Sequence, residues 1–105
     1  MGAIFRINER DIPWFGYEPQ IRVKALTRDH PRAPSTQYVE YGAGHTDPLH
    51  SHDTDEVFVV VEGELWLEGL ERSSGPGSIV FIPRDTEYAV RAGAEGVRYF
   101  RIVVS

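Results

Sequence analysis

A chain of 105 residues has the length of one domain. Its 11 basic and 16 acidic residues give a formal net charge of −5, which argues against a nucleic-acid partner, because binding phosphates needs a basic patch. It contains no cysteine, so disulfides and thiolate–metal sites are excluded, and any metal must be bound by nitrogen and oxygen.

Nothing in the sequence indicates export or a membrane. The first twenty residues carry charged and polar side chains where a signal peptide would have an apolar core. No apolar run approaches the ~20 residues that a membrane helix requires. We therefore expect a cytoplasmic protein with no membrane partner.

The N-terminal third predicts short strands between turns. Residues 3–7 are apolar and typical of an edge strand, and residues 11–16 indicate a turn. Residues 21–27 alternate apolar and basic side chains, as a half-exposed strand does. Residues 29–35 contain two prolines and predict a loop, in which His30 is expected to be exposed and not a ligand.

The rest of the chain consists of short β-prone runs at roughly 8–12-residue spacing, separated by turn signals. No segment keeps the 3.6-residue apolar period of a helix over three turns. The pattern indicates an all-β sandwich or barrel, and about eight strands favour a jelly-roll barrel. The strands predicted in this part are residues 36–41, 57–61, 65–68, 78–82, 87–91 and 97–104.

The strand at residues 57–61 is apolar on both faces. Phe58 and Val60 share the parity of Glu56 and are expected to face the interior, so the opposite face needs cover from a second sheet segment or a partner subunit. We expect a homodimer. A tight turn at residues 62–64 is predicted to return the chain as a hairpin, and another turn is predicted at residues 92–96.

His50, His52 and Glu56 are the candidate metal ligands. They have the same parity, so an extended strand points all three to one side. Two imidazoles and a carboxylate on one face offer the donors of a divalent metal site. The simpler alternative is three polar residues on a solvated strand end.

The stretch around them resembles the first motif of the cupin family. That motif is a glycine, five residues, His-x-His, three or four residues, a glutamate, six residues and a glycine. Gly44, His50, His52, Glu56 and Gly63 fill these places with every spacing correct. With the second motif, the resemblance covers about half of the chain.

The family's second motif is a glycine, five residues, Pro-x-Gly, two residues, a histidine, three residues and an asparagine. Gly77 and Pro83 match it. Asp85 stands where the family has the second glycine, Tyr88 where it has the histidine, and Ala92 where it has the asparagine. This motif is therefore only partly present.

The resemblance implies a single cupin domain over residues 1–105, a double-stranded β-helix or jelly-roll barrel. An N-terminal arm would cover residues 1–35 and the motif-bearing barrel residues 36–105. In cupins the two histidines and the glutamate of the first motif, with the histidine of the second, bind one metal inside the barrel. Zinc, iron, nickel and manganese all suit such donors.

Tyr88 stands at the fourth ligand position, and three interpretations stay open. It could coordinate as a phenolate, because a bound cation can lower a phenol pKa from ~10. It could act as a general acid or base, or donate a hydrogen bond to substrate. It could be a core tyrosine. Under the last two, three protein ligands leave an open position, as in catalytic metal sites.

Further pocket residues are expected at strand ends. Tyr41, Gln37 and Arg84 are candidates for substrate binding, and Arg84 could hold an anionic substrate. His45 has the wrong parity relative to His50 and is not expected to be a ligand, although it could border the barrel mouth.

The resemblance leaves the reaction open, because cupins include dioxygenases, isomerases, lyases, polyketide cyclases and non-enzymatic binders. We favour a metal-dependent enzyme acting on a small organic molecule, with the metal as a Lewis acid or binding dioxygen. The alternatives are a small-molecule binding module without turnover and a stable barrel with a vestigial site.

Overall fold

The computed structural model describes residues 2–104, which form antiparallel strands and one short 3-10 helix. The strands pair in the order β1-β2-β3-β7-β5-β6, and β4 pairs with β7. The expected all-β jelly-roll barrel is confirmed. The elements are η1 (Glu9–Asp11), β1 (Phe15–Glu18), β2 (Ile21–Ala25), β3 (Ser35–Tyr41), β4 (Thr46–His50), β5 (Asp55–Leu67), β6 (Ile79–Ile82) and β7 (Tyr88–Val104).

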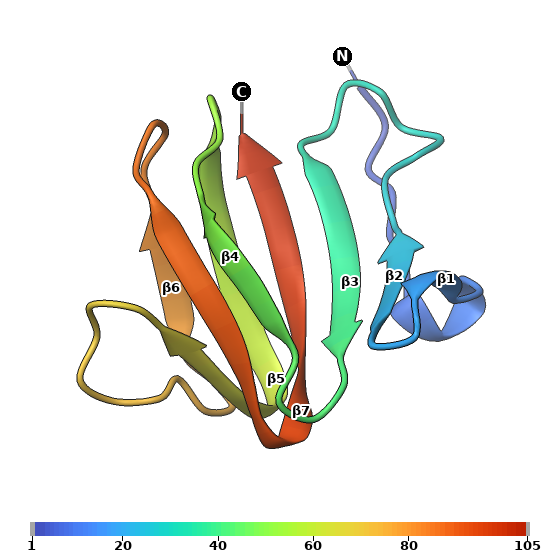
Figure 1. The fold of residues 1–105 in the computed structure, drawn as a ribbon. Coiled ribbons are helices and arrows are strands. Elements are labelled where there is room, and N and C mark those ends of the chain that lie inside the picture. Colours follow the sequence, from blue (N-terminus) through green and yellow to red (C-terminus); the bar gives the residue numbers. More distant parts are fainter. Residues whose placement is uncertain (1, 105) are drawn as a thin grey trace.

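The two long strands, β5 and β7, build both walls of the barrel. The first half of β5 pairs with the second half of β7, with Val59 opposite Phe100. The last residues of β5 pair with the start of β7, with Leu65 opposite Ala92. In Figure 1, β7 runs down as an orange band, bends at the bottom and returns as a red arrow. Both strands therefore bend from one wall into the other.

Two sequence predictions are corrected by these strands. The chain forms no hairpin at residues 62–64 and no strand-ending turn at residues 92–96, because β5 and β7 continue through them. Gly63 (φ 74°) and Gly96 (φ 81°) adopt left-handed backbone conformations at the bends. Glycine takes these angles without a Cβ clash, so it can bend a strand as well as end one.

The barrel interior follows the predicted parity. Phe58 is 2% exposed and Val60 is 1% exposed, so both face the interior as expected. Val57 and Val59 on the opposite face are half-buried, and Val61 is 37% exposed. The outer face of β5 thus keeps apolar surface in contact with water.

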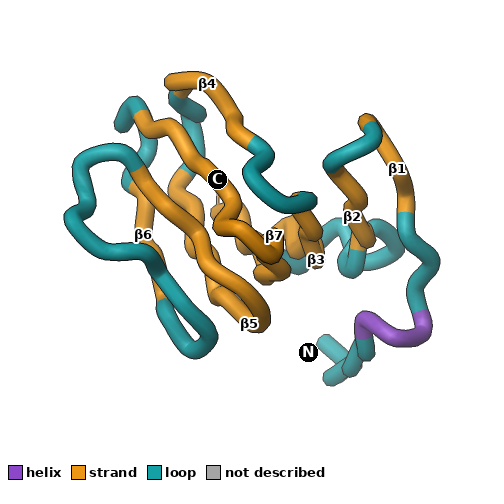
Figure 2. The backbone as a smooth tube through the Cα atoms, turned by 60° about the horizontal axis from the view of Figure 1, so that its bottom comes forward, coloured by secondary structure: helices purple, strands orange, loops and turns teal. Residues whose placement is uncertain are grey.

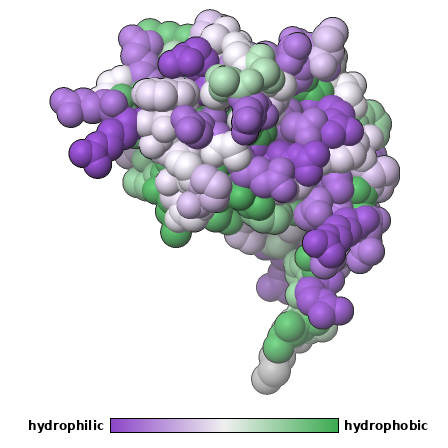
Figure 3. Space-filling model, turned by 90° about the horizontal axis from the view of Figure 1, so that it is seen from below, coloured by the Kyte–Doolittle hydropathy of each residue, from purple (hydrophilic) through white to green (hydrophobic). Residues whose placement is uncertain are grey.

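Residues 3–11, the first part of the predicted N-terminal arm, run outside the barrel, whereas β1 and β2, which also lie in that predicted arm, belong to the sheet. The edge strand predicted at residues 3–7 is wrong: this segment has no strand partner, and Ile4 is fully exposed. Phe5 instead stacks on His30, with ring centres 3.7 Å apart, so His30 is half-buried, contrary to the expected exposure. Figures 2 and 3 show the arm extending from the body.

The arm is fixed to the outer side of the sheet by a charged contact. The Lys24 Nζ donates to Glu9 Oε2 at 2.9 Å and to the Glu9 carbonyl at 2.8 Å. After η1 the chain enters β1 at Phe15, so the turn predicted over residues 11–16 is replaced at its end by a strand. Within residues 2–104, no helix has the length and apolar character needed to cross a membrane.

Candidate functional site

The motif residues meet at one end of the barrel, uppermost in Figure 1. His50 is the last residue of β4, Glu56 is the second residue of β5, and Tyr88 is the first residue of β7. His50 and Tyr88 are paired across β4 and β7. Strand ends from three different segments therefore place these side chains together.

Glu56 is the centre of this group, with only 1% of the residue exposed. Its Oε2 accepts a hydrogen bond from Arg101 Nε at 2.5 Å, and its Oε1 accepts one from the Tyr88 hydroxyl at 3.1 Å. The His52 Nε2 lies 3.5 Å from the same Oε1. A buried carboxylate needs such partners, because removing its charge from water is otherwise very costly.

His50 has a defined tautomer. Its Nδ1 lies 2.7 Å from the Pro48 carbonyl oxygen. A carbonyl can only accept, so Nδ1 carries the proton and the Nε2 lone pair is available to a cation. Metal-binding histidines commonly have their other nitrogen fixed in this way.

Two pairwise separations in this group match those expected around a divalent ion. Two donors ~2.1 Å from a tetrahedral ion lie about 3.4 Å apart, close to the separation between His52 Nε2 and Glu56 Oε1. The His50 and His52 ring centres are 5.0 Å apart, and two imidazoles on one ion at ~2.1 Å would be separated by roughly that distance. Among the described residues, however, no three His, Asp or Glu side chains form a ready-made metal cluster.

Tyr88 is held as a neutral phenol. Burial, and then the charge of Glu56, raise the pKa of Tyr88 well above its usual value. The hydroxyl is therefore a donor to Glu56. Its ring lies 4.4 Å from the His50 ring, centre to centre.

Five of the predicted site residues line one cavity of about 230 Å³: Gln37, Tyr41, His50, His52 and Tyr88. Arg84 lies elsewhere, in the exposed turn after β6. Its backbone N–H donates to Asp55 Oδ1 at 2.9 Å, and its side chain is 50% exposed. Arg84 thus lies beside the start of β5 but outside the lining of this cavity.

Arg101 is the most important cavity residue that the sequence interpretation missed. Besides Glu56, it donates through Nη1 to Gln37 Oε1 at 3.1 Å. A signal was present in the sequence: Arg101 shares strand parity with Val97 and Tyr99, which are both buried. A charged residue at an inward-facing position of an apolar strand indicates a partner inside the barrel.

Asp47 is a second missed cavity residue. It accepts a hydrogen bond from the Tyr41 hydroxyl at 2.6 Å, and its other oxygen lies 3.0 Å from His45 Nε2. Burial and the hydrogen bond to Asp47 raise the pKa of Tyr41 well above its usual value. His45 is therefore engaged by Asp47 and by the Tyr41 ring, 4.7 Å away between centres.

Comparison with known proteins shows which family and fold the chain matches. The model of the cupin domain matches residues 37–104. The chain is 31% identical over 85 residues to the dimethylsulfoniopropionate lyase DddW of Ruegeria pomeroyi. The match covers 76% of this chain and 56% of DddW, so the chain corresponds to little more than half the length of that relative.

Solved structures share the fold at lower identity. The polyketide cyclase RemF from Streptomyces resistomycificus superposes with a TM-score of 0.81 at 22% identity, covering 97% of this chain and 80% of RemF. KdgF from Halomonas sp. superposes with a TM-score of 0.76 at 22% identity, covering 94% of each chain. These likenesses extend over nearly the whole chain.

Proposed function

This chain belongs to the cupin domain family, and from that premise we propose that it is a metal-dependent enzyme acting on a small organic molecule. The observation that carries the proposal is the buried carboxylate of Glu56, whose Oε1 lies 3.5 Å from the Nε2 of His52, a residue that lines the small cavity. The likeness to a lyase supports catalysis rather than binding alone.

His50, His52 and Glu56 would hold the ion, with one more position open to substrate. A divalent ion bound there supplies Lewis-acid chemistry toward a substrate oxygen. Tyr88 keeps its proton on the hydroxyl, donates it to Glu56 Oε1 in a hydrogen bond and so orients that carboxylate, and the residue also lines the cavity. Arg101 pairs with the Glu56 carboxylate through Oε2.

Dimethylsulfoniopropionate, named for the relative, is the first substrate to assay. The protein should be tested after loading with zinc, iron, nickel or manganese, and again after chelation. Turnover that appears with a metal and disappears with the chelator would support an enzyme. Failure to bind any metal under every loading condition would refute the proposal.

The alternative is a small-molecule binding protein with a metal-organised pocket. It is favoured by the replacement of the second-motif histidine by Tyr88, whose hydroxyl is already engaged by Glu56. A ligand screen that finds tight binding and never a product would select it over the enzyme.

Metal affinity should separate a ligand from a supporting residue. We expect His52→Ala to weaken metal binding by more than ~100-fold, because it removes a donor. Tyr88→Phe should weaken it about tenfold or less, the lower end of the effect of a residue that orients a ligand. Isothermal titration with zinc measures both, with His45→Ala as the control because Asp47 holds that imidazole. The reverse order would make Tyr88 a ligand.

We also propose a homodimer formed through the outer face of β5, β6 and β7. Ile79 is 71% exposed and Phe81 is 60% exposed, and they pair with Val59 and Val57 across the same face. A continuous apolar sheet face is typical of a protein interface. The apolar residues are on one edge of the sheet, so a second copy could cover them by two-fold symmetry.

If the proposed dimer forms through this face, a charge placed on the face should dissociate it. Phe81→Arg should convert a dimer at micromolar concentration into a monomer, because an unpaired cation would be buried at the interface. Light scattering coupled to size-exclusion chromatography measures this. Leu70→Arg is the control, because Leu70 is 54% exposed but lies outside these strands. A monomeric wild-type protein would contradict the proposal.

A further inference from the structure

We propose that the mouth of the barrel is a subsite for a carboxylate of the ligand, and that Arg28 binds it. This inference rests on the proposed function in one respect, that a small molecule enters the inner cavity. It adds the chemical class of that molecule, an organic acid whose anionic end stays at the mouth.

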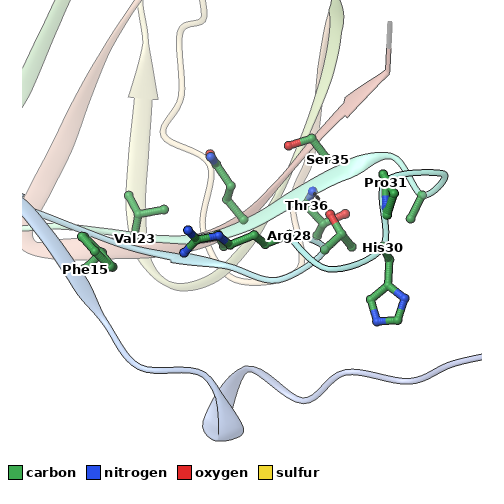
Figure 4. Close-up of a pocket in the computed structure, with 11 residues that line it drawn as sticks. Phe15, Val23, Arg28, His30, Pro31, Ser35 and Thr36 are labelled. Atoms are coloured by element: carbon green, nitrogen blue, oxygen red, sulfur yellow. Dashed lines mark hydrogen bonds between the residues drawn. The ribbon is translucent and has the colours of Figure 1, made fainter.

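The mouth is a cavity of about 520 Å³ between β2, β3 and the loop that joins them. Figure 4 shows Arg28 lying across it, between Val23 on one side and Thr36 on the other, while His30 points away. Among the described residues that line it, Arg28 is the only permanently charged side chain, and none is Asp or Glu. A protein with a net charge of −5 thus presents a locally positive entrance.

Arg28 is available to a ligand. Within residues 2–104, the Arg28 guanidinium makes no hydrogen bond or ion pair with another residue. Arg22, Arg98 and Arg101, in contrast, are each paired with a glutamate. A guanidinium presents paired N–H donors that match the two oxygens of a carboxylate. It can therefore receive an anion without first breaking a bond within the protein.

The loop that carries Arg28 is ordered by its own hydrogen bonds. The Thr27 hydroxyl donates to the Pro34 carbonyl at 3.0 Å and accepts from the Thr36 N–H at 2.9 Å. The His30 N–H donates to the Thr27 carbonyl at 3.0 Å. These bonds fix the base of the loop on both sides of Arg28. Less conformational entropy of the loop is therefore lost when Arg28 binds an anion.

The mouth adjoins the inner cavity. Val23 and Gln37 line both spaces. Gln37 accepts a hydrogen bond from Arg101 at 3.1 Å, so it connects the entrance to the group around Glu56. A molecule could therefore place a carboxylate at Arg28 and extend its other end toward His52.

Glutarate, a linear dicarboxylate, is the probe, and 1,5-pentanediol is its uncharged counterpart. We expect glutarate to shift the backbone amide signals of Thr27, Arg28 and Thr36 saturably in a nuclear magnetic resonance titration at pH 7, and pentanediol not to. Arg28→Met should weaken glutarate binding about tenfold or more, the effect of losing a charged hydrogen bond.

Arg32→Met is the matched control. Arg32 belongs to the same loop and carries the same charge, but it lines a separate space beside the N-terminal arm. It should leave glutarate binding unchanged. The inference is overturned if glutarate does not bind the wild-type protein, if Arg28→Met binds it as well as wild type, or if Arg32→Met weakens binding equally.

Glutarate binding at the mouth can be tested separately from metal binding. His52→Ala should retain the amide shifts at the mouth, and Arg28→Met should retain zinc affinity. Loss of glutarate binding in Arg28→Met, in a protein that takes up no metal, would support the subsite while refuting the metal proposal. Normal zinc binding with no effect of Arg28→Met would do the reverse.

Discussion

Arg101→Gln should lower the free energy of unfolding by about 3 kcal/mol, the lower end of the range for breaking a buried ion pair. Glu56 is 1% exposed, and Arg101 is the cation that accompanies it, with Nε 2.5 Å from Oε2. Without Arg101, the Tyr88 hydroxyl is a single neutral donor to a buried charge. Urea unfolding at pH 7, followed by tryptophan fluorescence, measures the difference.

Two further variants make this result specific. Arg84→Gln should change stability by no more than about 0.5 kcal/mol, because Arg84 is half exposed and its Nε is 3.6 Å from Asp55. The double variant Glu56→Gln with Arg101→Gln should be more stable than Arg101→Gln alone, because no charge is left buried. If Arg101→Gln were as mild as Arg84→Gln, Glu56 would not depend on its partner.

Gly63→Ala should destabilise the fold by at least about 3 kcal/mol, more than a left-handed backbone conformation alone would cause. A Cβ at Gly63 would lie 2.1 Å from the Gly96 carbonyl oxygen and 3.0 Å from the Val97 Cα. These are backbone atoms of the adjoining strand, so relief requires β5 and β7 to separate at their bends. Urea unfolding and near-ultraviolet circular dichroism would report the loss.

Gly44→Ala separates the two causes. Gly44 has φ 71°, almost the angle of Gly63, but a Cβ there would meet nothing within 4 Å. Its substitution should therefore cost only about 1–2 kcal/mol, the effect of the backbone conformation. Equal destabilisation by the two variants would contradict the close approach of the strands.

The same bends explain why the turns predicted from the sequence at residues 62–64 and 92–96 were wrong. Glu62-Gly63-Glu64 has the local features of a tight turn, and the structure uses its glycine to bend a strand. Local sequence cannot separate these outcomes, because glycine permits both. The pairing of Gly63 with Val97 and of Leu65 with Ala92 decides between them, and both are contacts between residues far apart in the sequence.

The candidate site was predictable to a different degree. The parity of His50, His52 and Glu56 and the position of Tyr88 in the partial second motif predict a shared site. In the structure His52 and Tyr88 both lie beside Glu56, but the two histidines and Glu56 form no ready-made metal cluster among the described residues. Arg101 was missed because its partner Glu56 is 45 residues earlier in the chain. The sequence around Glu56 or around Arg101 does not indicate which cation pairs with the buried carboxylate.

The central claim is that His50, His52 and Glu56 converge on one divalent ion inside the barrel. A crystal structure of the protein loaded with zinc, with data collected on both sides of the zinc absorption edge, tests it most directly. We predict one anomalous peak bounded by His50 Nε2, His52 Nε2 and Glu56 Oε1, at ~2.0–2.2 Å from each. No anomalous peak in the barrel, or one bound only by residues outside this group, would contradict the account.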